Sequence, residues 1–122
     1  MRVLVVDDQA TMRRIIVKMV EKVGVDECRE AADAHDALRI LAATHIDLII
    51  TDWNMPGMSG IEFIRTLRAQ DATRAIPVIM VTSNASKDEV MAAIKLGITA
   101  YVVKPFTAEA MTERVRALLF PP

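Results

Sequence analysis

Residues 46–60 read IDLIITDWNMPGMSG and hold a strand, a loop and the start of a helix. The apolar run Leu48–Ile50 predicts a strand buried on both faces, as strands of helix-covered parallel sheets are. Asp52 ends that strand, and Trp53–Gly57 carries the Asn, Pro and Gly typical of a loop. Ser59 then begins the capping-box pattern S-G-I-E, which predicts the first turn of a helix. The stretch therefore predicts one strand–helix unit of an α/β fold.

Outward from this stretch, the same alternation of strand and helix occurs five times along the chain. The other expected strands lie at Val3–Val6, Glu27–Ala31, Val78–Val81 and Tyr101–Val103. The Glu27–Ala31 run alternates polar and apolar residues, which indicates an edge strand that is wet on one face. We therefore expect a doubly wound parallel sheet with strand order 2-1-3-4-5.

The expected helices alternate with these strands. The first runs from about Gln9 to Val23, and the others begin near Asp33, Ser59, Ser86 and Thr107. The apolar stripe of the first consists of Met12, Ile15, Ile16, Met19, Val20 and Val23. Gly97 is expected to end the fourth helix.

The composition is that of an ordinary globular domain. The chain has 122 residues, about half of them apolar, and a net charge of −1, which indicates one domain over residues 1–122. Scattered basic residues argue against a nucleic-acid interface. No run of about eighteen apolar residues and no signal-peptide pattern is present. The lone Cys28 cannot form an internal disulfide. We expect a cytoplasmic monomer that binds neither nucleic acid nor membranes.

Four of the expected strands end in polar side chains, namely Asp7 with Asp8, Asp52, Thr82 and Lys104. The carboxyl ends of parallel strands share one edge of a sheet, where ligands bind next to the point at which the strand order reverses. Three carboxylates repel one another unless a cation lies among them, and hard oxygen ligands with room for water suit Mg²⁺. The pattern predicts a magnesium-dependent phosphoryl acceptor.

Each of these residues has an ordinary structural role when taken alone. Asp52 could be a turn residue, and Asp7 and Asp8 could cap the first helix. Thr82 could simply end a strand, and Lys104 could be a solvated loop lysine. Their joint occurrence at four strand ends favours one site, in which the central-strand carboxylate attacks a phosphoryl group in line and the hydroxyl donates to a phosphoryl oxygen.

Four other residues were weighed for a role at this edge. Pro105 restricts the preceding lysine to extended geometry and allows a cis peptide bond, which would aim the ammonium over the sheet edge. His35 and His45 lack His or Cys partners at metal-ligand spacing and are expected on helix surfaces. Trp53, the only tryptophan, adjoins the acidic pocket and should report changes there.

Five motifs carry a family resemblance that covers essentially the whole chain. They are VVDD at residues 5–8, TMRRI at 11–15, TDWNMPGMSG at 51–60, VT at 81–82 and YVVKPF at 101–106. The chain resembles the receiver domain of two-component response regulators, and most of all the stand-alone regulators of chemotaxis. The resemblance implies a flavodoxin-like (βα)5 fold and phosphorylation of Asp52 by a histidine kinase.

The resemblance also implies roles for the other residues of the edge. Asp8, Asp52 and the backbone carbonyl of Asn54 would ligate Mg²⁺, the implied cofactor. Asp7 would act through water, and Lys104 would pair with Asp52 or the phosphoryl oxygens.

Thr82 and Tyr101 would form the switch pair of such a domain, since phosphorylation adds charge and acceptor oxygens that draw in a hydroxyl. The implied output face lies on the fourth helix, fifth strand and fifth helix and includes Ala85, Lys87, Val90, Tyr101, Val103, Phe106 and Arg114. Its implied partners are a downstream target, such as a flagellar motor switch protein, and a phosphatase. Asn84 and Ser83 depart from the family pattern, in which an acid and an alanine are usual, and bear on the lifetime of the phosphoryl group.

Three other interpretations compete with this one. An aspartyl phosphatase of the haloacid-dehalogenase type would need Asp-x-Asp after the first strand, where this chain has Asp7-Asp8-Gln9. A flavin-binding module would need a hydroxyl-rich phosphate loop at the same place. A receiver domain of a larger DNA-binding regulator is the third, with Pro121-Pro122 as the start of a linker. The sequence shows no output domain, which favours the stand-alone form.

Overall fold

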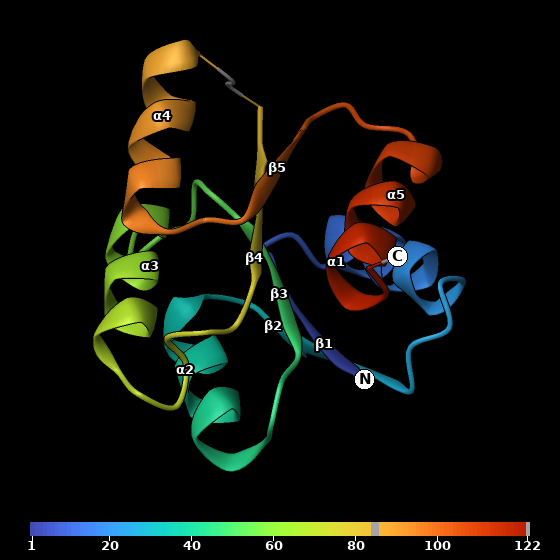
Figure 1. Ribbon diagram of the computed structural model, residues 1–122, viewed down its shortest axis with the longest axis horizontal. Coiled ribbons are helices and arrows are strands. Elements are labelled where there is room, and N and C mark those ends of the chain that lie inside the picture. Colours follow the sequence, from blue (N-terminus) through green and yellow to red (C-terminus); the bar gives the residue numbers. More distant parts are fainter. Residues whose placement is uncertain (84–85, 122) are drawn as a thin grey trace.

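Strands and helices alternate along residues 1–83 and 86–121, the part of the chain that the computed structural model describes (Figure 1). The strands are β1 (Arg2–Val6), β2 (Glu27–Ala31), β3 (Leu48–Asp52), β4 (Val78–Thr82) and β5 (Ala100–Val103). The helices are α1 (Ala10–Glu21), α2 (Ala34–Ala43), α3 (Gly60–Ala69), α4 (Lys87–Leu96) and α5 (Ala108–Leu119). The strands pair in parallel in the order β2-β1-β3-β4-β5, so the predicted flavodoxin-like fold is confirmed.

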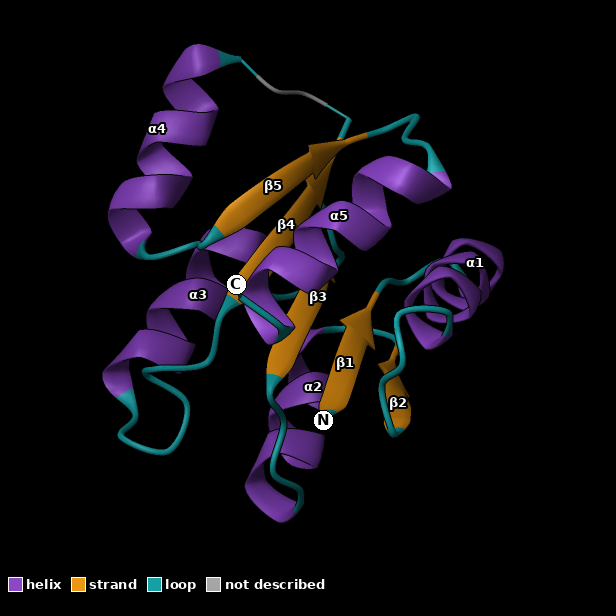
Figure 2. Ribbon diagram, turned by 45° about the vertical axis from the view of Figure 1, so that its right-hand side comes forward, coloured by secondary structure: helices purple, strands orange, loops and turns teal. Residues whose placement is uncertain are grey.

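The sheet is covered on both faces, by α1 and α5 on one side and by α2, α3 and α4 on the other (Figures 1 and 2). Strand β1 shows why. Leu4 and Val6 join the buried cluster on the α2–α4 side, whereas Val3 and Val5 join the one on the α1–α5 side. Burying such a side chain stabilises the fold by about 1.5–3 kcal/mol. Strands that are apolar on both faces therefore require two helical layers.

The helix starts follow the predicted capping residues. The side-chain oxygens of Asp33, Ser59, Ser86 and Thr107 each accept a hydrogen bond from the backbone N–H three residues further on. Such a cap contributes about 1 kcal/mol to stability. Gly97 ends α4 in the left-handed conformation, as expected. Within the described ranges, no helix is long and apolar enough to cross a membrane.

Helix α1 is shorter than predicted, since it ends at Glu21. Its predicted apolar stripe is confirmed except at one position: Ile16 and Val20 are buried, and Met12, Met19 and Val23 pack against the same core cluster. Ile15 is 41% exposed, contrary to the prediction. Adjacent helix positions lie about 100° apart, and Ile16 takes the position that faces the core.

Helix α4 buries few side chains along its length, but hydrogen bonds hold its C-terminal end. It buries only Val90 and Ala93. The guanidinium of Arg68, on α3, donates to the carbonyl of Gly97 at 2.7 and 3.2 Å. The same group donates at 2.8–3.2 Å to three carbonyls of the loop between α3 and β4. Arg68 therefore joins α3, this loop and the end of α4.

Candidate functional site

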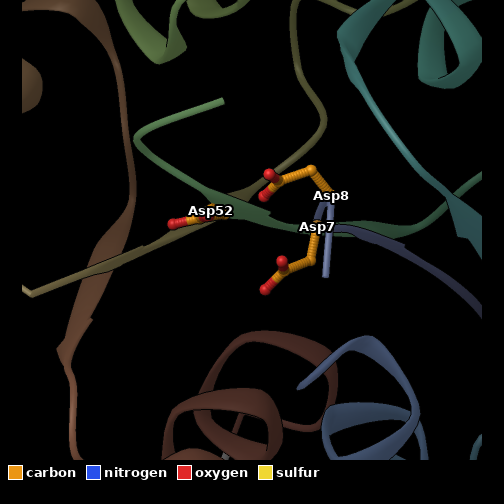
Figure 3. Close-up of side chains that lie close together, drawn as sticks. All are labelled: Asp7, Asp8 and Asp52. Carbon is orange, nitrogen blue, oxygen red and sulfur yellow. The ribbon is translucent and has the colours of Figure 1, made fainter. Parts of the chain in front are cut away.

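The three acids of the predicted pocket gather at the carboxyl edge of the sheet. Strands β1 and β3 are neighbours, and Val6 pairs with Thr51, so the residues that follow, Asp7 and Asp52, lie side by side. Asp8 extends from the loop after β1 (Figure 3). One carboxylate oxygen from each of the three acids lies within 4.8 Å of the others. The structure thus brings together the acids that the sequence predicted.

The Asp7 carboxylate is buried and incompletely paired. It is 1% exposed, and its Oδ1 accepts a hydrogen bond of 2.8 Å from the Gln9 backbone N–H. Its Oδ2 is buried without a hydrogen-bond partner. Burial is the largest cause that raises the pKa of Asp7, and the charges of Asp52 and Asp8 act in the same direction. The Gln9 N–H and the Lys104 ammonium lower that pKa, but they do not offset the rise.

Lys104 lies over the pocket as expected. Its Nζ is 3.4 Å from Asp52 Oδ1 and 4.0 Å from Asp7 Oδ2. The Lys104–Pro105 peptide bond is cis, in agreement with the prediction. The Lys104 N–H donates to the carbonyl of Thr82 at 2.8 Å, which joins the ends of β4 and β5. One ammonium therefore lies within 4.0 Å of two of the three carboxylates, those of Asp7 and Asp52.

The donor set fits a hard divalent cation. Its ligand atoms would be carboxylate oxygens, which Mg²⁺ prefers, and Asp8 is exposed, so that water can reach the group. Asp7 Oδ2 is the direct sign that a further positive group is needed, because it is buried without a hydrogen-bond partner, the Lys104 ammonium lies 4.0 Å away, and an unsatisfied buried carboxylate oxygen is costly. Asn54, the further expected ligand through its carbonyl, lies in the loop two residues after Asp52.

The expected switch residues share one face of the sheet. Thr82 is fully buried at the end of β4, and Tyr101 is half-buried on β5 against the cluster on the α2–α4 side. Met80 pairs with Tyr101, and Thr82 pairs with Val103. Side chains two residues apart on a strand share a face, so Thr82 lies diagonally from Tyr101 on the neighbouring strand. Ser83 is exposed, while Asn84 and Ala85 lie outside the described residues.

Most of the described residues of the expected output face are accessible. Lys87, Val103 and Arg114 are exposed, and Phe106 is half-buried. A hollow of about 360 Å³ is lined by residues of β5, α5 and the loop between them, among them Tyr101, Val103, Phe106 and Arg114.

Val90 departs from the expected output face. It is only 8% exposed, because it shares the inward face of α4 with Ala93, three residues on. The exposed apolar side chains of this helix are instead Met91 and Ile94, which are 47% and 48% exposed.

Two features of the site were not predicted. Arg13 donates to the carbonyl of Asp7 at 2.7 Å, a contact that the sequence analysis did not predict. Trp53 is 9% exposed and packs against Gly60, where an added Cβ would lie 2.5 Å from the indole. A glycine at the first position of a helix, just after a tryptophan loop, is the only sequence signal for that contact.

The histidines take no part in the site. His35 is exposed on α2. His45 lies in the loop before β3, not on a helix as expected, with its Nε2 3.0 Å from an oxygen of Asp47. The one candidate metal-binding group within residues 1–83 and 86–121 contains no histidine.

Comparisons with known proteins agree with this arrangement. The chain is 42% identical over 118 residues to the chemotaxis protein CheY of Pseudomonas aeruginosa, covering 97% of this chain and 95% of the relative. It is 39% identical to the chemotaxis protein CheY-3 of Vibrio cholerae, covering 94% of this chain and 88% of that protein.

Solved structures agree as well. The crystallised chemotaxis protein CheY4 of Vibrio cholerae has a TM-score of 0.90 at 32% identity, covering 97% of this chain and 98% of the other. A response regulator receiver protein from Pseudomonas putida has a TM-score of 0.86 at 31% identity, covering 94% of each chain. Residues 3–116 match the family described as the response regulator receiver domain. The chain therefore belongs to the response regulator receiver domain family.

Proposed function

We propose that Asp52 accepts a phosphoryl group in a magnesium-dependent reaction and that this modification changes the binding of a partner protein. The single observation that carries the proposal is the acidic pocket, in which three carboxylates gather, two of them beside one ammonium, and one buried carboxylate oxygen has no hydrogen-bond partner. The family supports it, since this CheY-like chain is a signalling domain and not a conventional enzyme.

The cation would be held by Asp8, Asp52 and the Asn54 backbone carbonyl, with Asp7 acting through water. Mg²⁺, when bound, would neutralise the charge that gathers as a phosphoryl group approaches the carboxylates. The exposed Asp8 gives the ion access from solvent, whereas the buried Asp7 gives a fixed negative charge.

Asp52 is the proposed nucleophile. A carboxylate oxygen would attack the phosphorus in line, the P–N bond of a phosphohistidine would break, and the electron pair would leave with the imidazole nitrogen. Lys104 Nζ, now 3.4 Å from Asp52 Oδ1, would pair with an oxygen of the new phosphoryl group. A histidine kinase is the donor that this chemistry requires.

Thr82 and Tyr101 are proposed to carry the change outward. A phosphoryl group adds nearly two negative charges and three acceptor oxygens, to which the Thr82 hydroxyl would donate. A shift of Thr82 would alter the packing next to the half-buried Tyr101 ring, on the same face of the sheet. The change would then reach the output face formed by α4, β5 and α5, at Lys87, Val103, Phe106 and Arg114.

The downstream partner is proposed to be a protein of the chemotaxis machinery, such as a flagellar motor switch protein. The names of the two relatives support this, since both are called chemotaxis proteins. A phosphatase is the second proposed partner, and the departures of Ser83 and Asn84 from the family pattern bear on how far the lifetime of the phosphoryl group depends on it.

The test uses acetyl phosphate, a small donor that needs no partner protein. With Mg²⁺, the intact mass of the parent should rise by one phosphoryl group, and chelator should prevent the rise. Asp52→Asn should not be labelled, whereas Asp88→Asn, on the exposed start of α4, should be labelled like the parent. Full labelling of Asp52→Asn would refute the assignment of this residue.

A further inference from the structure

Arg13 makes contacts that no part of the phosphoryl chemistry uses. It lies in the first turn of α1 with its side chain 17% exposed. Its Nη1 donates to the backbone carbonyl of Asp7 at 2.7 Å. Its Nε donates to the carboxylate of Glu30, on β2, at 2.9 Å. The guanidinium thus bridges the loop after β1 to the neighbouring edge strand.

These contacts fix the backbone of Asp7 on both sides. The Asp7 N–H donates to the Ala31 carbonyl at 3.1 Å, and the Asp7 carbonyl accepts from Arg13. The Asp7 Oδ1 accepts from the Gln9 N–H. The remaining polar atom of Asp7 is Oδ2, the buried oxygen that faces the pocket. The orientation of that oxygen, and of Asp8 after it, therefore depends on the contacts that hold the Asp7 backbone.

The contact acts through geometry, because the guanidinium donates to the backbone carbonyl of Asp7 and is itself held by the Glu30 carboxylate. Arginine suits this place because its planar fork can donate to two acceptors at once, whereas a lysine ammonium at the end of a flexible chain holds neither acceptor in a fixed direction.

We propose that Arg13, itself held by Glu30, is a positioning residue that fixes the Asp7–Asp8 loop in the geometry that receives the divalent cation. The inference rests on the proposed function, because it concerns the same pocket. Residues that orient metal ligands without touching the metal typically change metal affinity by about 10–100-fold when they are mutated. We expect an effect at the lower end of this range, because the loop keeps its bonds from Gln9 and to Ala31.

The experiment is a Mg²⁺ titration of the unphosphorylated protein, followed by Trp53 fluorescence and, independently, by the rise in Tm with Mg²⁺ concentration. Arg13→Met should raise the Mg²⁺ midpoint about tenfold. Arg13→Lys should raise it nearly as much, since it keeps the charge but loses the fork. Glu30→Ala should give a smaller rise. Arg14→Met, the matched change at the next, exposed position, should leave the midpoint unchanged.

The outcomes separate this inference from the function on which it rests. A parent that shows no Mg²⁺ response in either readout contradicts the proposed function and the inference together. A parent that responds, with an unchanged midpoint in Arg13→Met and Arg13→Lys, overturns the inference alone, even if Tm in chelator falls. A normal midpoint in Arg13→Lys beside a raised one in Arg13→Met would show that charge, not the fork, matters, and would also overturn it. If Arg13→Met does not fold, Arg13→Lys and Glu30→Ala decide the question.

Discussion

The acidic pocket and the output face formed by α4, β5 and α5 lie close together, yet they are built differently. In the pocket, Asp7 and Asp52 are 1% and 7% exposed, and hydrogen bonds or ion pairs hold their polar groups. On the face, α4 presents Met91 and Ile94 to solvent and buries only two residues. A reaction at one carboxylate needs side chains in a fixed geometry. Recognition by a partner protein needs accessible side chains on an element that buries little surface and can shift.

Helix α4 combines a fixed part and a loosely packed part. Its C-terminal end is tied through the Gly97 carbonyl to Arg68, while its length carries little buried surface. We therefore expect changes that start at Thr82 to alter the packing of α4 more easily along its length than at its C-terminal end.

The largest loss of stability should follow Gly60→Ala, which disturbs the rigid loop beside the acidic pocket. The added Cβ would lie 2.5 Å from the Trp53 ring and 2.8 Å from the Trp53 carbonyl oxygen, which cannot move without shifting the loop after Asp52. We expect a loss of about 3 kcal/mol in the free energy of unfolding, measured by urea denaturation.

Gly24→Ala is the matched control for that change. Gly24 has a φ of +97° and nothing within 4 Å of the added Cβ, so it should lose only about 1 kcal/mol from backbone strain. Equal losses in the two variants would mean that the pocket loop is less rigid than we infer.

The next effect concerns the anchored end of α4. Arg68→Met should lose about 2 kcal/mol, because it removes the hydrogen bonds from Arg68 to four carbonyls, among them the part-buried carbonyls of Gly97 and Ile76. Amide exchange near Gly97 should also become faster. Arg65→Met, at an exposed position of the same helix, should change stability by less than about 0.5 kcal/mol. Similar losses in both variants would show that the hydrogen bonds of Arg68 do not anchor the C-terminal end of α4.

Asp7→Asn should have the opposite sign and stabilise the protein in chelator at pH 7, by about 1 kcal/mol. Burial raises the pKa of Asp7 in the folded state above its ordinary value, so the folded state binds this proton more tightly than the unfolded state does. The stability from this group is complete below that value and is lost as the pH rises through the raised pKa.

The measurement is Tm against pH in chelator for the parent and Asp7→Asn. The parent should lose stability as the pH rises through the raised pKa of Asp7, and the variant should lack this contribution. Saturating Mg²⁺ should reverse the order by stabilising the parent. A variant that melts below the parent in chelator at pH 7 would show that the carboxylate is not a strained group.

The smallest effect should follow Met91→Ala on the exposed side of α4. Met91 is 47% exposed, so the change should cost less than about 0.5 kcal/mol. Val90→Ala, one residue earlier and 8% exposed, should cost more than twice as much. Circular dichroism melts of both variants compare them directly, and an inverted order would mean that α4 turns its other face to the sheet.

The sequence predicts the pocket better than the face, for a physical reason. An apolar strand ends where its run ends, so Asp7, Asp52 and Lys104 could be placed at the sheet edge by counting. The sequence of a helix contains no comparable mark of where its buried face ends and its exposed face begins. Which of two neighbouring apolar residues faces inward depends on how the helix packs, and Ile15, which is 41% exposed, was assigned to the core face for this reason.

The contacts of Arg13 and Arg68 could not be predicted at all. Most of their acceptors are backbone carbonyls, which every residue has, and the one acidic partner, Glu30, lies on another strand. No spacing in the sequence marks such pairs, because the fold alone brings them together.

The most direct test of the central claim is to find which carboxylate carries the phosphoryl group. Borohydride converts an aspartyl phosphate into homoserine, which marks the modified residue for peptide mass spectrometry. After treatment with acetyl phosphate and Mg²⁺, the account predicts homoserine at position 52 in the parent and at no other aspartate. Homoserine at position 8 or 7, with an unmodified Asp52, would contradict it.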